Sequence, residues 1–136
     1  MSNFVYNKAK QGILNGKFNF AQKSFKVLFT NSTYVPNQNL NEFVSDINPS
    51  SIVFRSNNLL SVLNTNGTID ADDLDFTLGA NISFKSIILF QSEVLDQESR
   101  LLAYIDDAVG LPYSGVSIAV SSTIVWNNLS GKILSI

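Results

Sequence analysis

The sequence contains neither cysteine nor histidine. Without cysteine the chain has no disulfide framework and no thiolate metal site. Without histidine it has no Ser-His or Cys-His triad, no ordinary zinc catalysis and no imidazole acid–base chemistry. Phosphate-binding glycine patterns are absent as well. We therefore expect a protein that is not an enzyme and that holds no cofactor and no metal.

Charged residues are few, at 15% of 136 residues, with 9 basic and 11 acidic side chains and a net charge of -2. A charge this close to zero gives no field that favours nucleic acid. The N-terminus lacks the apolar stretch of a signal peptide, and no run approaches the roughly 18 apolar residues of a membrane helix. We expect neither nucleic acid nor a membrane as a partner.

Apolar residues, by contrast, are abundant: 45% are hydrophobic and 11% aromatic. This balance is typical of a folded chain, and the length is that of one domain. We predict a single domain over 1–136, in which a helix–strand–helix segment at 1–47 packs on a strand-rich body at 48–136. A surface rich in Asn and Ser suits packing against another copy or another protein. It is equally typical of an AT-rich coding sequence, and composition leaves both interpretations open.

Two short helices are predicted near the N-terminus. The first covers 3–16, with Asn3 as N-cap and Asn15-Gly16 as the left-handed stop. The second covers 39–46, because Asn39 and Glu42 have capping-box spacing. Its expected apolar face consists of Leu40, Phe43, Val44 and Ile47.

Alternation of apolar and other residues predicts strands for most of the remaining chain. They are expected at 24–30, 51–55, 58–64, 68–71, 76–78, 82–91, 100–105, 116–126 and 132–136. The segment 82–91 becomes apolar on both faces, which is typical of a central strand. Asn66-Gly67 and 128–131 are predicted hairpin connections. The fold class that follows is mainly β, an antiparallel β-sandwich or jelly-roll-like domain with one or two short helices near the N-terminus.

Two groups of carboxylates are candidates for a metal site or a catalytic site. Asp70, Asp72 and Asp73 could form a loose calcium site, but the spacing does not fit an EF-hand loop, so we interpret them as solvating a turn. Asp106-Asp107 could supply one half of a glycosidase-like pair. Carboxylate pairs are common in domains of this size, and no aromatic sugar platform is evident around this one. We predict no catalytic residue.

Basic residues gather at the N-terminus, where no acid precedes Glu42. Lys8, Lys10 and Lys17 belong to this group, together with Lys23 and Lys26. They could contact phosphate or an acidic protein partner, or they could be solvated lysines without a partner. Tyr34, Tyr113 and Trp126 adjoin predicted loops, where aromatic side chains favour interfaces. The candidate interface residues are therefore Lys8, Lys10, Lys17, Tyr34 and Tyr113.

Several stretches, taken in order, resemble a family of small structural proteins from tailed bacteriophages. They are KAKQGILNG (8–16), FKVLFT (25–30), YVPN (34–37), EFVSDI (42–47), DADDLDF (70–76), LLAYID (101–106) and VWN (125–127). The similarity extends over nearly the whole chain. It departs from the family after Ile47, where NPSSIVF replaces a glycine-rich stretch.

The resemblance implies a capsid decoration or cement protein, made in the host cytoplasm and bound to the outer surface of the virion. The implied partners are the major capsid protein and further copies of the chain, as a homotrimer. In this interpretation the lysine-bearing N-terminal segment faces the shell and the strand-rich body forms the trimer. One alternative is a tail, neck or baseplate subunit of the virion. A second, from another class, is a carbohydrate-binding β-sandwich module.

Overall fold

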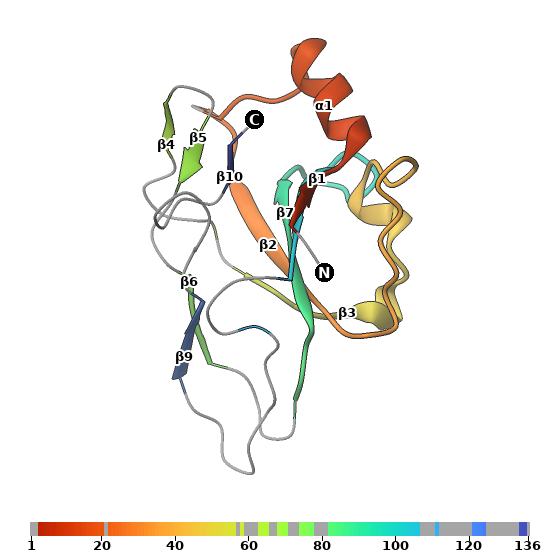
Figure 1. The fold of residues 1–136 in the computed structure, drawn as a ribbon, viewed down its shortest axis with the longest axis vertical. Coiled ribbons are helices and arrows are strands. Elements are labelled where there is room, and N and C mark those ends of the chain that lie inside the picture. The colour runs from red at the N-terminus through yellow and green to blue at the C-terminus, as the bar shows by residue number, and fades with distance from the viewer. Residues whose placement is uncertain are drawn as a thin grey trace.

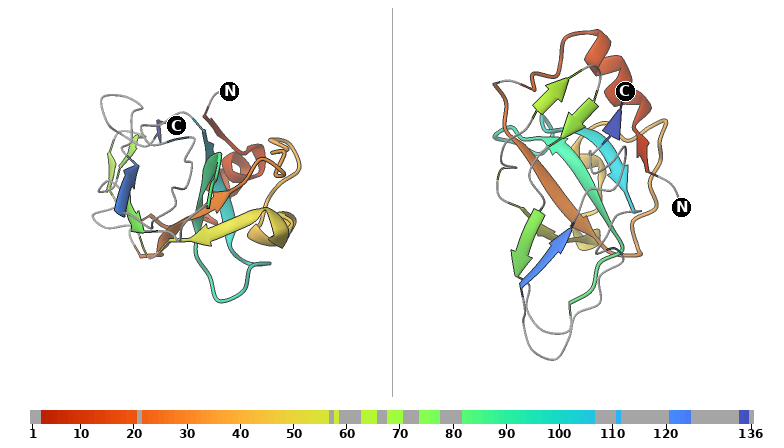
Figure 2. Two further views of the ribbon diagram at one scale, coloured as in Figure 1. Left: turned by 90° about the horizontal axis from the view of Figure 1, so that it is seen from below. Right: turned by 60° about the vertical axis from the view of Figure 1, so that its left-hand side comes forward.

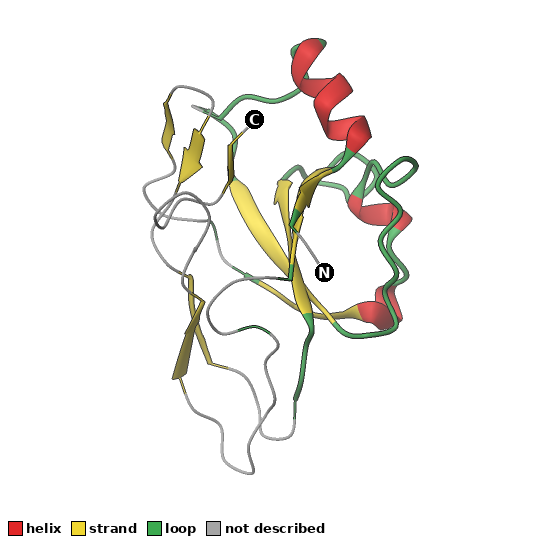
Figure 3. Ribbon diagram, in the orientation of Figure 1, coloured by secondary structure: helices red, strands yellow, loops and turns green. Residues whose placement is uncertain are grey.

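The computed structural model describes residues 3–20, 22–56, 58, 63–65, 68–70, 74–77, 82–106, 111, 121–124 and 134–135. Side chains are described within 3–20, 22–56, 58, 82–106 and 111. Across these ranges the chain is mainly β, with one short α-helix and two 3-10 helices (Figures 1 and 3). No helix in the described ranges has the length and apolar character needed to cross a membrane.

The largest element is a five-stranded antiparallel sheet with the order β1-β8-β7-β2-β3. Its strands are β1 (Phe4–Val5), β2 (Phe25–Thr30), β3 (Ile52–Arg55), β7 (Ser86–Gln91) and β8 (Arg100–Ile105). The predictions of β2 and β8 are confirmed, and β3 and β7 lie inside their predicted ranges. Residues 1–47 thus supply two strands, β1 and β2, to the same sheet as three strands from 48–136.

The prediction of a central strand within 82–91 is confirmed. β7 lies in the middle of the sheet, and all six of its side chains are buried. Strand registers place Leu28, Ile88, Tyr104 and Phe4 in one row across the sheet. Because side chains alternate along a strand, Phe29 and Ile87 face the opposite side. Both faces of the central strands are therefore covered, as continuous apolar runs require.

The first predicted helix begins later than expected. α1 covers Asn7–Leu14, while Phe4 and Val5 form β1, which pairs with Tyr104 and Ala103. Asn3 is not the N-cap, since its Oδ1 accepts a hydrogen bond from the backbone N of Asp106 at 3.1 Å. Phe4 is aromatic and Val5 is β-branched. Beside an open sheet edge such residues gain more stability from strand pairing than from another helical turn.

The second predicted helix, at 39–46, is wrong except for its last turn. Only η1 (Val44–Asp46) is helical, a 3-10 turn followed by η2 (Pro49–Ser51). The side chain of Asn37 accepts from the amides of Asn39 and Leu40, and Asp46 accepts from those of Glu42 and Phe43. These bonds satisfy the backbone in a turn instead of a helix. Of the expected apolar face, Val44 and Ile47 are buried and Leu40 is exposed.

Five short strands form two smaller sheets, described by their backbone. β4 (Leu63–Thr65), β5 (Thr68–Asp70) and β10 (Leu134–Ser135) make one, and β6 (Leu74–Thr77) and β9 (Ser121–Ile124) the other. In Figures 1 and 2 they lie on the side of the large sheet away from α1, η1 and η2. A sandwich or jelly-roll topology stays a prediction.

The two predicted hairpins differ in outcome. β4 and β5 pair antiparallel with Thr65 opposite Thr68, which agrees with a two-residue connection at 66–67. The connection predicted at 128–131 lies outside the described residues; of the strands on either side of it, β9 pairs with β6 and β10 with β5. Local turn residues alone could not show that the two last strands join different sheets.

Candidate interaction surface

The C-terminal end of α1 is fixed by a Schellman turn. The backbone N of Gly16 donates to the carbonyl of Ile13 at 3.2 Å, and that of Lys17 donates to Gly12 at 2.8 Å. Gly16 has a φ of 71°, which side-chain-bearing residues rarely adopt. The predicted stop at Asn15-Gly16 is confirmed, and it holds Lys17 beside the end of the helix.

One side of α1 packs on the protein and the other faces solvent. Ala9 and Gly12 are buried, and a Cβ at Gly12 would lie 3.0 Å from a ring carbon of Phe18. Glycine at this position therefore permits the close approach of the Phe18 ring. On the other side Lys10 is exposed and Leu14 is 86% exposed. A leucine this exposed contributes nothing to the core of one copy.

The lysines of this region carry unneutralised charge. Lys8 is partly exposed, whereas Lys10 and Lys17 are exposed. None of the three has an ion pair among the described residues, whose ion pairs join Lys23 to Glu93, Arg55 to Asp96 and Arg100 to Glu42. We call the two lysines of the helix, Lys8 and Lys10, the α1 surface. Leu14 and Lys17 form a separate patch at the end of α1.

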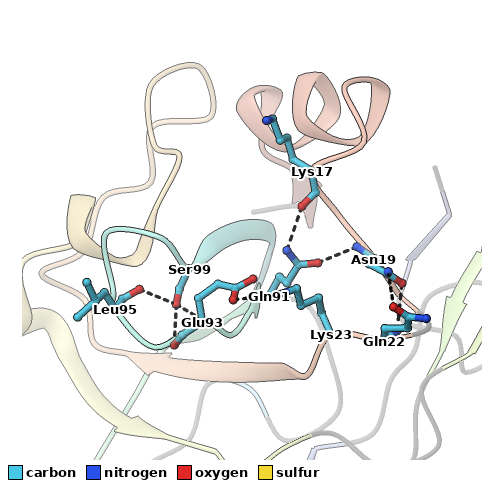
Figure 4. Close-up of polar contacts among 8 residues, drawn as sticks. All are labelled: Lys17, Asn19, Gln22, Lys23, Gln91, Glu93, Leu95 and Ser99. Carbon is cyan, nitrogen blue, oxygen red and sulfur yellow. Dashed lines mark hydrogen bonds and ion pairs between the residues drawn. The ribbon is translucent and has the colours of Figure 1, made fainter.

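A buried glutamine at the end of β7 holds the chain that follows α1 (Figure 4). The side chain of Gln91 is 3% exposed; its Nε2 donates to the carbonyl of Lys17 at 3.0 Å, and its Oε1 accepts from the amide of Asn19 at 2.8 Å. Figure 4 shows the side chain of Lys17 extending away from Gln91. The lysine is thus held through its backbone while its charge remains free to meet a partner.

The connection between β7 and β8, residues 92–99, is a tightly bonded turn that we call the β7–β8 turn. Ser99 Oγ accepts from the amide of Glu93 at 2.9 Å and donates to the carbonyl of Leu95 at 3.0 Å (Figure 4). The amide of Glu98 donates to the same carbonyl. At its tip Val94 is 95% exposed and Leu95 49% exposed. Exposed aliphatic side chains on an ordered turn suit a contact with another protein.

The turn is also anchored to its surroundings. Asp96 forms a bidentate ion pair with Arg55, with both N···O distances at 2.7 Å. The amide of Ser45 donates to the carbonyl of Asp96, and that of Val44 to Ser99. Arg55 holds the pKa of the Asp96 carboxyl below its ordinary value through their hydrogen bond. The carboxylate is thereby retained in its charged, bonded form.

Tyr34, predicted to lie at an interface, is buried in the core instead of exposed. Its hydroxyl donates to Asn41 Oδ1 at 2.8 Å, so the hydroxyl of Tyr6, also 2.8 Å away, donates to Tyr34. Burial raises the pKa of Tyr34 to about 12 and that of Tyr6 above its ordinary value. The pair links the start of α1 to the loop that precedes η1. Such a buried side chain offers little surface to a partner.

The other predicted site residues lie partly inside and partly outside the described ranges. Lys8 and Lys10 lie in α1, on different sides of the helix, and Lys17 follows its end, whereas Tyr113 and Trp126 lie outside the described residues. Asp72, Asp73 and Asp107 also lie outside them, and Asp70 is described by its backbone in β5. Among the described residues no three carboxylates gather in a way that could hold a metal.

Three features of the surface are not among the predicted interface residues. They are the exposed Leu14, the Val94-Leu95 tip and the buried Gln91. Val5, Ala9 and Ile13 recur every four residues and Leu14 lies off that face, so its exposure could have been inferred. An apolar pair within an acidic turn was a second visible signal. The role of Gln91 had none, because it depends on where the chain returns after α1.

Comparison with known proteins identifies no relative: no family model, no curated protein and no solved structure matches this chain.

Proposed function

We propose that this chain is a non-enzymatic structural protein of a bacteriophage virion, a decoration or cement protein bound as a homotrimer to the outer surface of the major capsid lattice. The ordered resemblance of the seven sequence segments supports this family of functions. In this proposal the strands form a sandwich or jelly-roll-like domain. The observation that carries the contact with the shell is the α1 surface, an anchored basic helix without ion pairs among the described residues.

The α1 surface has the physical properties that such contact requires. Lys8 and Lys10 stand on a helix whose end is fixed by the Schellman turn and the Gln91 bonds. Unpaired lysines on an ordered support are attracted to an acidic surface, orient the approach and raise the association rate. A protein that binds only the assembled lattice stabilises it by mass action. Many copies on one lattice add the effect of multivalency.

Charge reversal tests this contact. Lys10→Glu, alone or with Lys8→Glu, is expected to lower the occupancy on purified shells, with a larger effect at low salt. Lys85→Glu is the matched control, since Lys85 is exposed and precedes β7 at the end away from Gln91. That strand is about 20 Å long. Unchanged occupancy in Lys8→Glu/Lys10→Glu, or an equal loss in Lys85→Glu, would contradict the contact.

The location on the virion separates this proposal from the alternative of a tail, neck or baseplate subunit. Labelled antibody or an electron-microscopy map of the purified virion measures it. Hundreds of copies over the head support a decoration protein. A ring of a few copies at the tail would establish the alternative instead.

A further inference from the structure

We propose that copies of this chain associate with each other through the β7–β8 turn of one copy and the end of α1 of the next. The turn contributes Val94, Leu95 and Glu98, and the helix end contributes Leu14 and Lys17. The inference rests on the self-association that is part of the proposed function, and it names the two surfaces that meet.

The exposed tip of the β7–β8 turn is held in place by several contacts. Val94 has almost its full surface in water, yet it stands on a turn fixed by Ser99, by the Arg55–Asp96 ion pair and by backbone bonds to η1. Binding through a segment already in place loses little conformational entropy. An aliphatic side chain presented in this way adds nothing to the stability of one copy and can contribute to binding when a partner covers it.

The two patches also match each other in chemistry. Leu14 is the most exposed aliphatic residue of α1, and Lys17 follows it with no ion pair among the described residues. The turn 92–99 contains Glu93, Asp96 and Glu98 and no basic residue. Glu93 and Asp96 already pair with Lys23 and Arg55, so within the described ranges Glu98 is the carboxylate of the turn left without an ion pair. Each patch therefore has an aliphatic centre beside an unpaired charge, and the charges are opposite.

The two patches lie close to each other along the surface of one copy. Gln91, the last residue of β7, bonds the backbone of Lys17, and the turn begins at the next residue. Both patches thus lie at one end of the molecule, but Leu14 and Val94 remain exposed, so they do not cover each other within one copy. Two copies related by a two-fold axis can make both contacts reciprocally, and a closed ring also uses both patches of every copy. A dimer or a trimer would agree with this geometry.

The apolar contact is tested by a matched pair of variants, measured by sedimentation velocity and light scattering. Val94→Ser is expected to weaken self-association about tenfold, the effect of exposing one valine side chain that a partner buries. Val35→Ser is the control, because Val35 is 81% exposed and lies outside both patches. Both substitutions are at solvent-exposed side chains, so circular dichroism should show unchanged folding.

The charge contact is tested by a swap. Lys17→Glu and Glu98→Lys are each expected to weaken association, and the double variant Lys17→Glu/Glu98→Lys is expected to recover it. A substitution that merely disturbed the fold would not be corrected by reversing the opposite charge. A wild-type chain that stays monomeric at its solubility limit would overturn the inference. So would equal effects of Val94→Ser and Val35→Ser, or a double variant no better than the single ones.

The outcome is independent of the shell experiment. A monomer that still binds shells would contradict this inference and leave the decoration function standing. A chain that associates through these patches but does not bind shells would contradict the decoration function alone.

Discussion

Replacing Gln91 with methionine tests whether the buried amide holds the chain after α1 in place. Met has nearly the volume of Gln and packs in apolar surroundings, but it can neither donate to the Lys17 carbonyl nor accept well from the Asn19 amide. The substitution therefore removes two hydrogen bonds, of 3.0 and 2.8 Å, while keeping the packing.

The expected loss follows from the two bonds. A neutral hydrogen bond contributes about 1 kcal/mol net to stability, so their loss should lower the free energy of unfolding by about 2 kcal/mol. Part of this loss will be offset because Lys17 and Asn19 are exposed and water can replace the missing partner. Burial of the more apolar methionine side chain stabilises the fold and also reduces the loss. We expect a final loss between about 1 and about 2 kcal/mol.

Urea denaturation followed by fluorescence or circular dichroism measures this difference. With an m value of about 2 kcal/mol/M, the midpoint should fall by about 0.5 to 1 M. Amide exchange provides a local readout, because the Asn19 amide should lose protection while the amides of β7 and β8 retain theirs. Gln97→Met is the control, as Gln97 is exposed on the same turn. If both variants have the same midpoint, Gln91 does not anchor the segment.

Three further changes have outcomes that can be worked out in the same way. Gly12→Ala should lower the stability measured by thermal denaturation by about 1 kcal/mol, because the added Cβ would crowd the Phe18 ring. This crowding should outweigh the preference of alanine for helices. A gain in stability would show that the ring moves aside. The free energy of unfolding should be constant below pH 10.0 and fall as the pH rises towards about 12, because the native state keeps the Tyr34 proton that the unfolded chain releases. Tyrosinate absorbance monitors the ionisation, and a free energy of unfolding that does not change over this range would contradict the expectation. Asp96→Asn should cost less than about 1 kcal/mol, and less still in high salt, because its ion pair with Arg55 is largely exposed; an effect independent of salt would assign the loss to packing.

The sequence predicted the central strands well because their signal is local. Phe25, Val27 and Phe29 alternate along β2, and 87–90 is apolar on both faces, so strand pairing and burial require the same residues. The stop at Gly16 was equally local, since glycine alone adopts its left-handed backbone at low cost. These elements would be found by the same reasoning in any chain with this pattern.

What could not be predicted depends on residues far away in sequence. Phe4 and Val5 continue an acceptable helical pattern, and they form a strand only because β8, a hundred residues later, offers them an edge. Asn39 and Glu42 have the spacing of a cap, yet Asn37 and Asp46 bond the same backbone more effectively in a turn. Competition of this kind is decided by tertiary contacts and not by local propensity.

The candidate surface stays a prediction. The sequence shows basic residues gathered before Glu42, and the structure places Lys8 and Lys10 in α1 and Lys17 just after its end. Tyr34 was misplaced because a loop tyrosine is often exposed, whereas here the hydroxyl finds buried partners in Tyr6 and Asn41. The Val94-Leu95 tip was missed because apolar pairs in a connection are ordinarily assigned to the core.

The strand order also determines when the large sheet can form during synthesis of the chain. β2 lies between β3 and β7, and within the described ranges β1 pairs with β8 alone, so the first strand of the large sheet to be made waits for the last one. Until Tyr104 has emerged, Phe4 lacks the ring that stacks on it in the finished protein. Completion of this sheet therefore waits for β8 and is a late, cooperative event instead of a vectorial one.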